Sequence, residues 1–291
     1  MKELAPNIFY IPGENDSRFP YCACLYLKGK KLRVLIDAGM GSKNLAPVKK
    51  MGIDLLILTH CHIDHRLTIR DIPDVPVWCH ETETIYLKDR ENFFTAAGFK
   101  RSGLDLSRLF ERVNGMFEFN IDRQLTGNEQ IDLGGMTLGV MHTPGHTPGH
   151  LSFAVPEYRL IFSGDIDLTP FGPFYGHDFG DIDDFLDSIQ KLTKQNAKVA
   201  ATGHAGPFNS HISERLEAYG QIIYHRDRLL LRHLTQPRSA ASLKNRNLFY
   251  KYYPDPTELI QWFEWVLIEK HLQRLTDSEK VNFKNGLWQK K

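Results

Sequence analysis

The first third of the chain alternates short apolar blocks with turns. Residues 21–27 and 32–39 are two such blocks on either side of Gly29-Lys30-Lys31, a pattern that predicts a β-hairpin. The apolar run 55–60 is shorter and ends abruptly in polar residues. A run of this kind is typical of a buried strand. We therefore expect it to deliver polar side chains to a site at its carboxyl end.

The rest of the chain continues the alternation and then changes character. Further strand-like blocks, each bounded by glycine or proline, are predicted at 127–135, 136–146, 150–155, 159–165 and 198–204. Helices are predicted where apolar residues recur every three or four positions, at 182–192, 213–234 and 256–275. The segment 81–118 is expected to be mainly helical and irregular. Asn285-Gly286, between two short blocks, is typical of a hairpin turn.

The composition is that of a globular chain. The 36 Lys and Arg nearly balance the 35 Asp and Glu, and the net charge of +1 predicts no overall attraction to nucleic acid or acidic lipid. No apolar stretch approaches the roughly 18 residues of a membrane helix, and the first residues do not resemble a signal peptide. We therefore expect a cytoplasmic protein with no membrane partner. Its four cysteines are expected to be free, buried thiols: Cys22, Cys24, Cys61 and Cys79.

The charge is unevenly distributed along the chain. Residues 216–291 hold 13 Lys and Arg against 8 Asp and Glu, a net charge of +5, which leaves −4 for residues 1–215. This shift predicts one domain at 1–215 and a mainly helical appendage at 216–291. Two helices followed by a small hairpin further suggest that the appendage is winged-helix-like.

The most informative motif is the run His60-Cys61-His62-Ile63-Asp64-His65, directly after the buried strand. Histidine is the commonest transition-metal ligand, and Asp suits a hard, hydrolytic cation. One tetrahedral site with an open position would not use four donors from a single loop. The spacing therefore indicates that two adjacent ions share these donors.

Three later donors repeat this arrangement, each at the end of a predicted strand. His146 lies in the run TPGHTPGH, Asp165 ends RLIFSGD, and His204 ends KVAATGH. All three are able to converge with the first motif on one edge of a sheet assembly.

The run HCHIDH is similar to the HxHxDH motif of the metallo-β-lactamase superfamily. The elements TPGHTPGH, SGD and GH follow in the family's order and with compatible spacing. The resemblance covers about residues 8–215. It implies a four-layer αββα sandwich, an α/β fold with a metal pair at one edge and the helical appendage outside it.

The resemblance also implies the ligand set. One ion would be held by His60, His62 and His146, a second ion by Asp64, His65 and His204, and Asp165 would bridge the two. Asp37 matches a family aspartate behind the site, where it would orient a ligand histidine. The implied cofactors are two divalent metal ions, with Zn²⁺ expected and Fe or Mn as alternatives.

The chemistry that follows is hydrolysis by a hydroxide held between two cations, whose charge makes water acidic near neutral pH. Asp64 and His204 are the catalytic candidates, Asp64 because it is able to accept a proton or orient the nucleophile. The expected substrate is a small carbonyl compound such as a thioester or lactone. The oligomeric state is not predicted.

Some features depart from the family pattern or lie outside it. Arg66, beside a ligand, is interpreted as facing solvent, with contact to an anionic substrate as the alternative. The phenylalanine-rich segment 89–128 is interpreted as core or cap, with a pocket lid as the alternative. Tyr175 and His177 are candidate substrate contacts, although a structural loop there is equally compatible. His150 is kept out of the ligand set. The remaining histidines are interpreted as surface or structural residues: His80, His142, His211, His225, His233 and His271.

Two other functions compete with hydrolysis of a small molecule. The basic tail, with aromatic residues, also suits single-stranded RNA, and it faintly resembles the appendage of lactamase-like endoribonucleases. These residues are Phe249, Tyr250, Tyr252, Tyr253, Trp262, Trp265 and Trp288. The other alternative is a metal-bound effector that signals through its surface, with hydrolysis incidental.

Overall fold

Two β-sheets form the centre of the molecule. The computed structural model describes residues 1–106, 116–117, 119–244 and 246–291. The first sheet has the strand order β1-β2-β3-β4-β5-β6-β7 and the second the order β12-β11-β10-β9-β8. The strands of the first sheet are β1 (Lys2–Ala5), β2 (Ile8–Ile11), β3 (Cys24–Lys28), β4 (Arg33–Ile36), β5 (Leu55–Ile57), β6 (Val77–His80) and β7 (Arg123–Leu125). Those of the second are β8 (Gln130–Asp132), β9 (Thr137–His142), β10 (Leu151–Val155), β11 (Leu160–Phe162) and β12 (Val199–Ala201).

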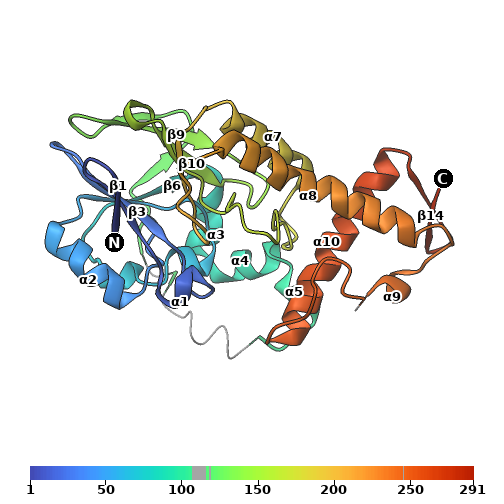
Figure 1. The fold of residues 1–291 in the computed structure, drawn as a ribbon. Coiled ribbons are helices and arrows are strands. Elements are labelled where there is room, and N and C mark those ends of the chain that lie inside the picture. Colours follow the sequence, from blue (N-terminus) through green and yellow to red (C-terminus); the bar gives the residue numbers. More distant parts are fainter. Residues whose placement is uncertain (107–115, 118, 245) are drawn as a thin grey trace.

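The sheets pack face to face, and helices cover both outer faces (Figure 1). Strand β3 contributes side chains to two apolar cores. Leu25 and Leu27 point into the core between the sheets, whereas Cys24 and Tyr26 point into the core under the outer helices. Successive side chains of a strand face opposite sides, so a strand buried on both sides is apolar throughout. The expected αββα sandwich is thereby confirmed.

Helices form the two outer layers, and the sequence predicted some of these helices. The first sheet is covered by α2 (Ser42–Met51), α3 (Thr84–Lys88), α4 (Arg90–Ala96) and α5 (Phe99–Ser102), and a short turn, α1 (Glu14–Ser17), precedes β3. Phe93 and Phe94 are buried in this layer, which agrees with the interpretation of the phenylalanine-rich segment as core. Phe110, from the same segment, lies outside the described residues.

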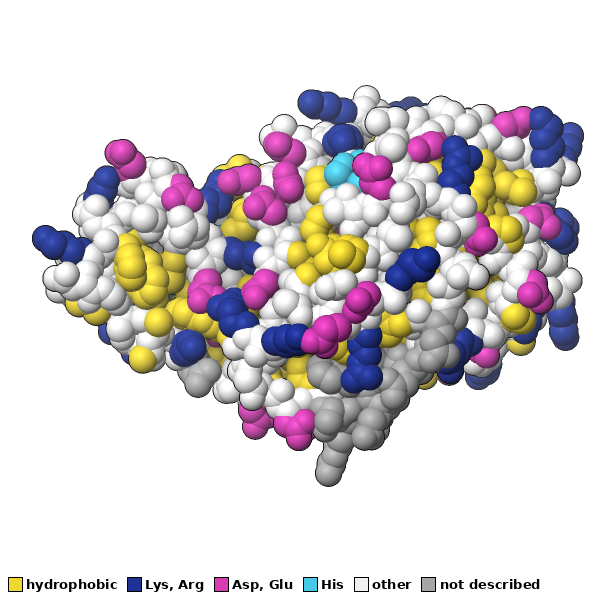
Figure 2. Space-filling model, turned by 180° about the vertical axis from the view of Figure 1, so that it is seen from behind, with side chains coloured by type: hydrophobic (Ala, Val, Ile, Leu, Met, Phe, Trp, Pro, Cys, Tyr) yellow, Lys and Arg dark blue, Asp and Glu magenta, His cyan; other side chains and the backbone are white. Residues whose placement is uncertain are grey.

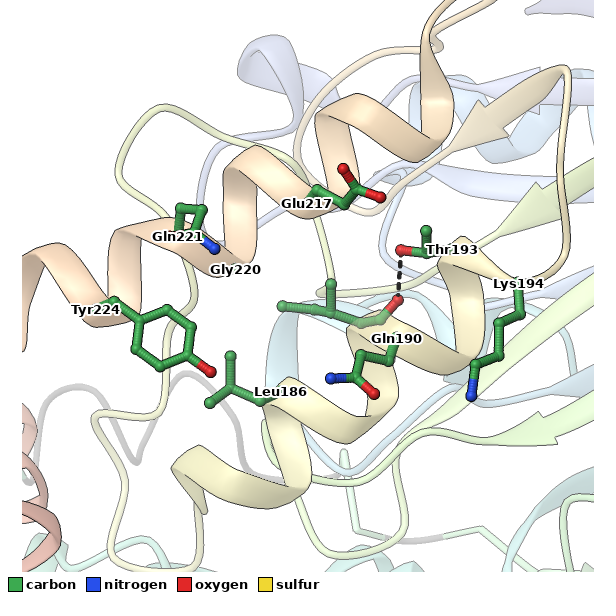
Figure 3. Close-up of a pocket in the computed structure, with 9 residues that line it drawn as sticks. Leu186, Gln190, Thr193, Lys194, Glu217, Gly220, Gln221 and Tyr224 are labelled. Atoms are coloured by element: carbon green, nitrogen blue, oxygen red, sulfur yellow. Dashed lines mark hydrogen bonds between the residues drawn. The ribbon is translucent and has the colours of Figure 1, made fainter. Parts of the chain in front are cut away.

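The second sheet is covered by α7 (Ile182–Thr193) and α8 (Ile212–His233). The side chain of Asp181 accepts hydrogen bonds from the backbone N–H groups of Asp183 and Asp184, which caps α7. A groove of about 420 Å³ lies between the two helices, with Gly220 and Tyr224 on one wall and Gln190 on the other (Figure 3). It contains none of the predicted metal ligands.

Helix α8 continues beyond the sandwich into the C-terminal part of the chain. There it packs with α9 (Ala240–Leu243) and α10 (Thr257–Asp277) around a fourth apolar core, which includes Leu230, Trp265 and Leu272. The chain ends in the hairpin β13 (Val281–Lys284) and β14 (Leu287–Lys290). Asn285 and Gly286 have positive φ of 53° and 74°, which confirms the predicted turn.

The surface carries charges of both signs. On the face drawn in Figure 2, acidic and basic side chains are intermixed around apolar patches. Among the residues that the structure describes, no helix combines the length and apolar character needed to cross a membrane.

Candidate metal centre

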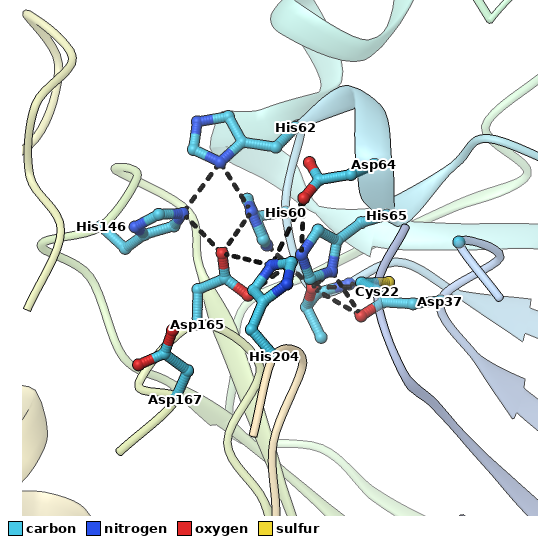
Figure 4. Close-up of polar contacts among 12 residues, drawn as sticks. Cys22, Asp37, His60, His62, Asp64, His65, His146, Asp165, Asp167 and His204 are labelled. Carbon is cyan, nitrogen blue, oxygen red and sulfur yellow. Dashed lines mark hydrogen bonds and ion pairs between the residues drawn. The ribbon is translucent and has the colours of Figure 1, made fainter. Parts of the chain in front are cut away.

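The predicted ligands converge at one edge of the two sheets (Figure 4). The motif 60–65 follows β5, His146 lies on the turn between β9 and β10, and Asp165 and His204 follow β11 and β12. All these loops leave the sheets on the same side, so donors separated by up to 144 positions meet.

The first group of donors consists of three imidazoles and one carboxylate. Nδ1 of His62 lies 2.9 Å from Nε2 of His60 and 2.8 Å from Nε2 of His146. Oδ2 of Asp165 is 3.2 Å from Nε2 of His146. One donor atom from each of these four residues lies within 4.8 Å of the others. These four residues could therefore hold one ion.

The second group is formed by Asp64, His65 and His204. Nε2 of His204 lies 3.3 Å from Oδ2 of Asp64 and 3.5 Å from Oδ2 of Asp165. Nε2 of His65 lies 3.0 Å from Oδ1 of Asp165. Asp165 therefore contacts both groups, in the bridging position that the family resemblance implied.

Hydrogen bonds at the far side of the rings orient the ligands. Nδ1 of His65 lies 2.8 Å from Oδ2 of Asp37, which is the position predicted for that aspartate. Nδ1 of His146 lies 2.7 Å from the carbonyl oxygen of Phe174, and Nδ1 of His204 lies 2.7 Å from that of Ser17. An acceptor next to Nδ1 keeps the proton on that nitrogen, which fixes the tautomer and leaves Nε2 free for a metal.

Burial also keeps part of the site in the form that binds metal. It holds the pKa of His60 and of His62 well below the usual range, and neighbouring imidazoles lower both values further. Neutral imidazoles bind metals, whereas imidazolium ions do not. A set of five histidines and two aspartates fits zinc, iron or manganese, and the residues present therefore fit the implied pair of divalent ions.

Two residues next to the ligands hold the loops. His150, outside both donor groups, accepts a hydrogen bond at Nε2 from the backbone N–H of Asp165 at 3.1 Å. Its burial lowers its pKa to about 3, which keeps that nitrogen an acceptor. Glu83 is fully buried and accepts from the backbone N–H groups of Cys61 and Gly149, at 2.7 and 2.6 Å. Sequence reasoning missed Glu83 because a single acidic residue in a helical segment carries no signal.

The interpretation of Arg66 as solvent-facing is wrong. Its side chain is fully buried, and Nη1 donates to the carbonyl oxygens of Leu87 and Met116 at 3.1 and 3.0 Å. The guanidinium lies 4.1 Å from the ring centre of Phe117, and burial lowers its pKa to about 10. Carbonyl oxygens and an aromatic face replace water around this cation. An anionic substrate has no access to it either.

The two candidate substrate contacts differ in position. The hydroxyl of Tyr175 is buried and hydrogen-bonded to Nε2 of His271 at 2.6 Å, so the expectation that it contacts substrate is wrong. His177 lies at the metal centre, with its ring centre 4.6 Å from that of His62. Its Nδ1 is buried and has no hydrogen-bond partner among the described residues.

Known proteins are similar to this chain over most of its length. A sequence model of the metallo-β-lactamase superfamily matches residues 18–204. The chain is 25% identical over 298 residues to a beta-lactamase-like protein 2 homolog of Caenorhabditis elegans, covering 99% of this chain and 91% of that protein. It is 25% identical over 267 residues to an atrochrysone carboxyl ACP thioesterase of Passalora fulva, covering 85% of this chain and 67% of that protein.

A solved structure extends the similarity to the whole fold. A metallo-β-lactamase family protein of Thermus thermophilus superposes with a TM-score of 0.79 at 23% identity, covering 99% of this chain and 100% of that one. Since the family match spans more than half of the chain and includes every proposed ligand, the chain belongs to the metallo-β-lactamase superfamily of metal-dependent hydrolases.

Proposed function

We propose that this protein is a binuclear metal hydrolase that cleaves a small carbonyl substrate, a thioester or a lactone. The observation that carries the proposal is the pair of donor groups that share Asp165. In this proposal His60, His62 and His146 hold one ion, and Asp64, His65 and His204 hold the other. The similarity to a thioesterase over 85% of the chain favours a thioester within the substrate class.

The metal pair, when bound, supplies a hydroxide near neutral pH and stabilises negative charge on the substrate. The protein's own groups accept protons and orient the ligands. In this proposal Asp64, whose Oδ2 lies 3.3 Å from Nε2 of His204, accepts a proton from the nucleophile. The buried Asp37 keeps His65 in the tautomer whose Nε2 faces Asp165.

Aromatic side chains surround the position of His177. Its ring centre lies 5.5 Å from that of Phe179, 5.4 Å from Phe99 and 5.1 Å from Phe263. We propose that the imidazole of His177, which is 7% exposed, contacts the polar end of the substrate while these rings contact its apolar part. The apolar surroundings favour an acyl compound over a strongly charged one.

Activity against a mixed panel tests the proposal. Purified protein, with its metal content determined by elemental analysis, is assayed on an ester, thioesters, lactones and a phosphodiester. We expect two divalent ions per chain, zinc in the first place, and hydrolysis of thioesters or lactones. Asp64→Asn is expected to lower kcat/KM by about 100-fold or more, whereas Asp54→Asn, in a surface ion pair with Arg33, leaves it unchanged.

Other outcomes point to the competing functions. Cleavage of the phosphodiester alone, with salt-dependent RNA binding, would replace this proposal by the nuclease. An effector would be indicated if Asp64→Asn abolished hydrolysis but left the protein's cellular role intact.

A further inference from the structure

We propose that Asp227, His271 and Tyr175 form a buried strut through which the C-terminal helices α8 and α10 orient His146. In this arrangement the three are positioning residues, since none of them touches the donor groups. The inference rests on the proposed role of His146 as a metal ligand.

The strut is a chain of two short hydrogen bonds. Oδ1 of Asp227, on α8, lies 2.7 Å from Nδ1 of His271, on α10. A carboxylate only accepts, so Nδ1 carries the proton and Nε2 is left as an acceptor. That acceptor lies 2.6 Å from the hydroxyl of Tyr175, which donates to it. Burial lowers the pKa of His271, and the ring is therefore neutral, as this sequence of donors requires.

The strut holds the loop 171–180, and this loop holds His146. The residue before Tyr175 is Phe174, whose carbonyl oxygen lies 2.7 Å from Nδ1 of His146. One peptide unit thus separates the end of the strut from the group that orients the ligand. A shift of Tyr175 would move this carbonyl and rotate the imidazole.

Further contacts from the same helices secure the loop at both ends. Arg226 of α8 donates to the carbonyl oxygens of Phe171 and Pro173, at 2.7 and 2.6 Å, and to the hydroxyl of Tyr175 at 2.9 Å. Lys270 of α10 donates to the carbonyl oxygens of Asp178 and Gly180, at 2.9 and 2.6 Å. Loop backbone that would otherwise bond to water is therefore bound to two helices.

The polar groups of the strut restrict the position of the loop 171–180 more than apolar groups would. Tyr175 and His271 are fully buried and Asp227 is 5% exposed. Burying such groups is costly unless each is hydrogen-bonded, so only one arrangement of the loop satisfies all three. An apolar contact of the same volume would tolerate sliding of the loop along α10.

The location of the strut explains why the family motifs do not reveal it. Asp227 and His271 lie beyond residues 18–204, the part that matches the family. Figure 1 shows α10 beside α5, and the ring centres of Phe263 and Phe99 lie 6.2 Å apart there. The C-terminal part thus reaches the rim of the metal centre, in addition to packing against α8.

Metal titration of the full chain tests the inference without a substrate. Zn²⁺ is titrated against a chromogenic chelator, and Co²⁺ is used for its visible spectrum. Tyr175→Phe removes only the hydroxyl, and His271→Leu removes the acceptor. Each variant is expected to bind one of the two metal ions about tenfold or more weakly and to change the Co²⁺ spectrum. His271→Gln, which retains an acceptor, is expected to recover part of the loss.

Tyr26→Phe is the matched control. The Tyr26 hydroxyl is a buried donor, 2.8 Å from the carbonyl oxygen of Gly52, in the layer of α2. Its loss should lower stability and leave both binding steps and the spectrum as in the unaltered protein. If Tyr175→Phe does not fold, the comparison of His271→Leu with His271→Gln decides.

The outcomes separate this inference from the proposed function. Two ions bound as tightly by Tyr175→Phe and His271→Leu as by the unaltered chain would overturn the strut. Two ions bound by the unaltered chain without thioester or lactone turnover would overturn the proposed function alone. An unaltered chain that binds no divalent ion would overturn both.

Discussion

Oδ2 of Asp37 lies 2.8 Å from Nδ1 of His65, and neither side chain is exposed to solvent. The other oxygen of Asp37 accepts from the backbone N–H of Thr59 at 2.8 Å. The carboxylate thereby connects the end of β4 to the loop that carries the HCHIDH motif. It also directs Nε2 of His65 toward Asp165.

Replacing Asp37 by Asn is expected to weaken metal binding at the group formed by Asp64, His65 and His204. The amide keeps the size of the side chain but can present a donor to Nδ1 of His65, which alters the tautomer. Loss of such a partner typically costs 10- to 100-fold in metal affinity. Asn also tolerates the positive φ of 65° at this position, so the backbone is preserved. Chelator competition measures the affinity, with Asp54→Asn as control; equal affinities in the two variants would contradict the assignment.

Glu83→Gln should lower stability by about 1–3 kcal/mol. Both carboxylate oxygens of Glu83 accept from backbone N–H groups, and an amide replaces one acceptor by a donor. Urea denaturation measures the free energy of unfolding. Glu217→Gln, at an exposed position of α8, serves as the comparison and should differ little from the unaltered protein.

Gly39→Ala is expected to damage the metal centre although Gly39 is not a ligand. A Cβ there would lie 1.8 Å from the carbonyl oxygen of Asp64 and 2.4 Å from Sγ of Cys22. The loop with Asp64 must move to make room, at a cost of about 1–3 kcal/mol or more, with loss of metal affinity. Thermal unfolding with and without metal measures both effects.

Gly220→Ala, in α8, is expected to stabilise the protein, in contrast to Gly39→Ala. The nearest atom to its Cβ would be Cδ1 of Ile189 at 3.6 Å, an ordinary contact. Alanine favours the helix by about 0.5–1 kcal/mol over glycine, so this variant should be more stable than the unaltered protein. A destabilised Gly220→Ala would show that packing of α7 on α8 is tighter than these distances indicate.

His80 is expected to make the metal-free protein sensitive to mild acid. Its buried ring stacks on His142 at 4.2 Å, and burial followed by the charge of His142 lowers its pKa, against the opposing charges of Glu81 and Glu129. Below the ordinary histidine pKa of about 6.5, His80 binds a proton in the unfolded chain but not in the folded chain. The free energy of unfolding therefore falls as pH decreases from about 6.5 toward the lower folded pKa, by at most about 1.4 kcal/mol per pH unit.

Denaturation in chelator at pH 7, 6 and 5 measures this slope. His80→Gln should reduce it, whereas His211→Gln, which removes a histidine whose side chain is 75% exposed, should not. Identical slopes in all three proteins would refute the assignment to His80.

The sequence by itself marked the donor residues, and the family resemblance that they carry implied the sandwich. Metal ligation demands particular donor atoms, so HCHIDH, His146, Asp165 and His204 were recognisable from residue types and order alone. The long helices and the Asn285-Gly286 hairpin were also predictable, because each has a periodicity or backbone preference of its own. The strands β1, β2, β6 and β7 were missed, although β5, β11 and β12, which are equally short, were predicted.

Only the tertiary structure decided what surrounds the donors. The carbonyl oxygens of Ser17 and Phe174 orient two ligands, yet every residue has a carbonyl group and no sequence pattern marks these two. Arg66 and Tyr175 look like surface and substrate residues along the chain, but packing buries both. Which distant groups surround a polar side chain depends on how separate elements pack, and this information is absent from local sequence.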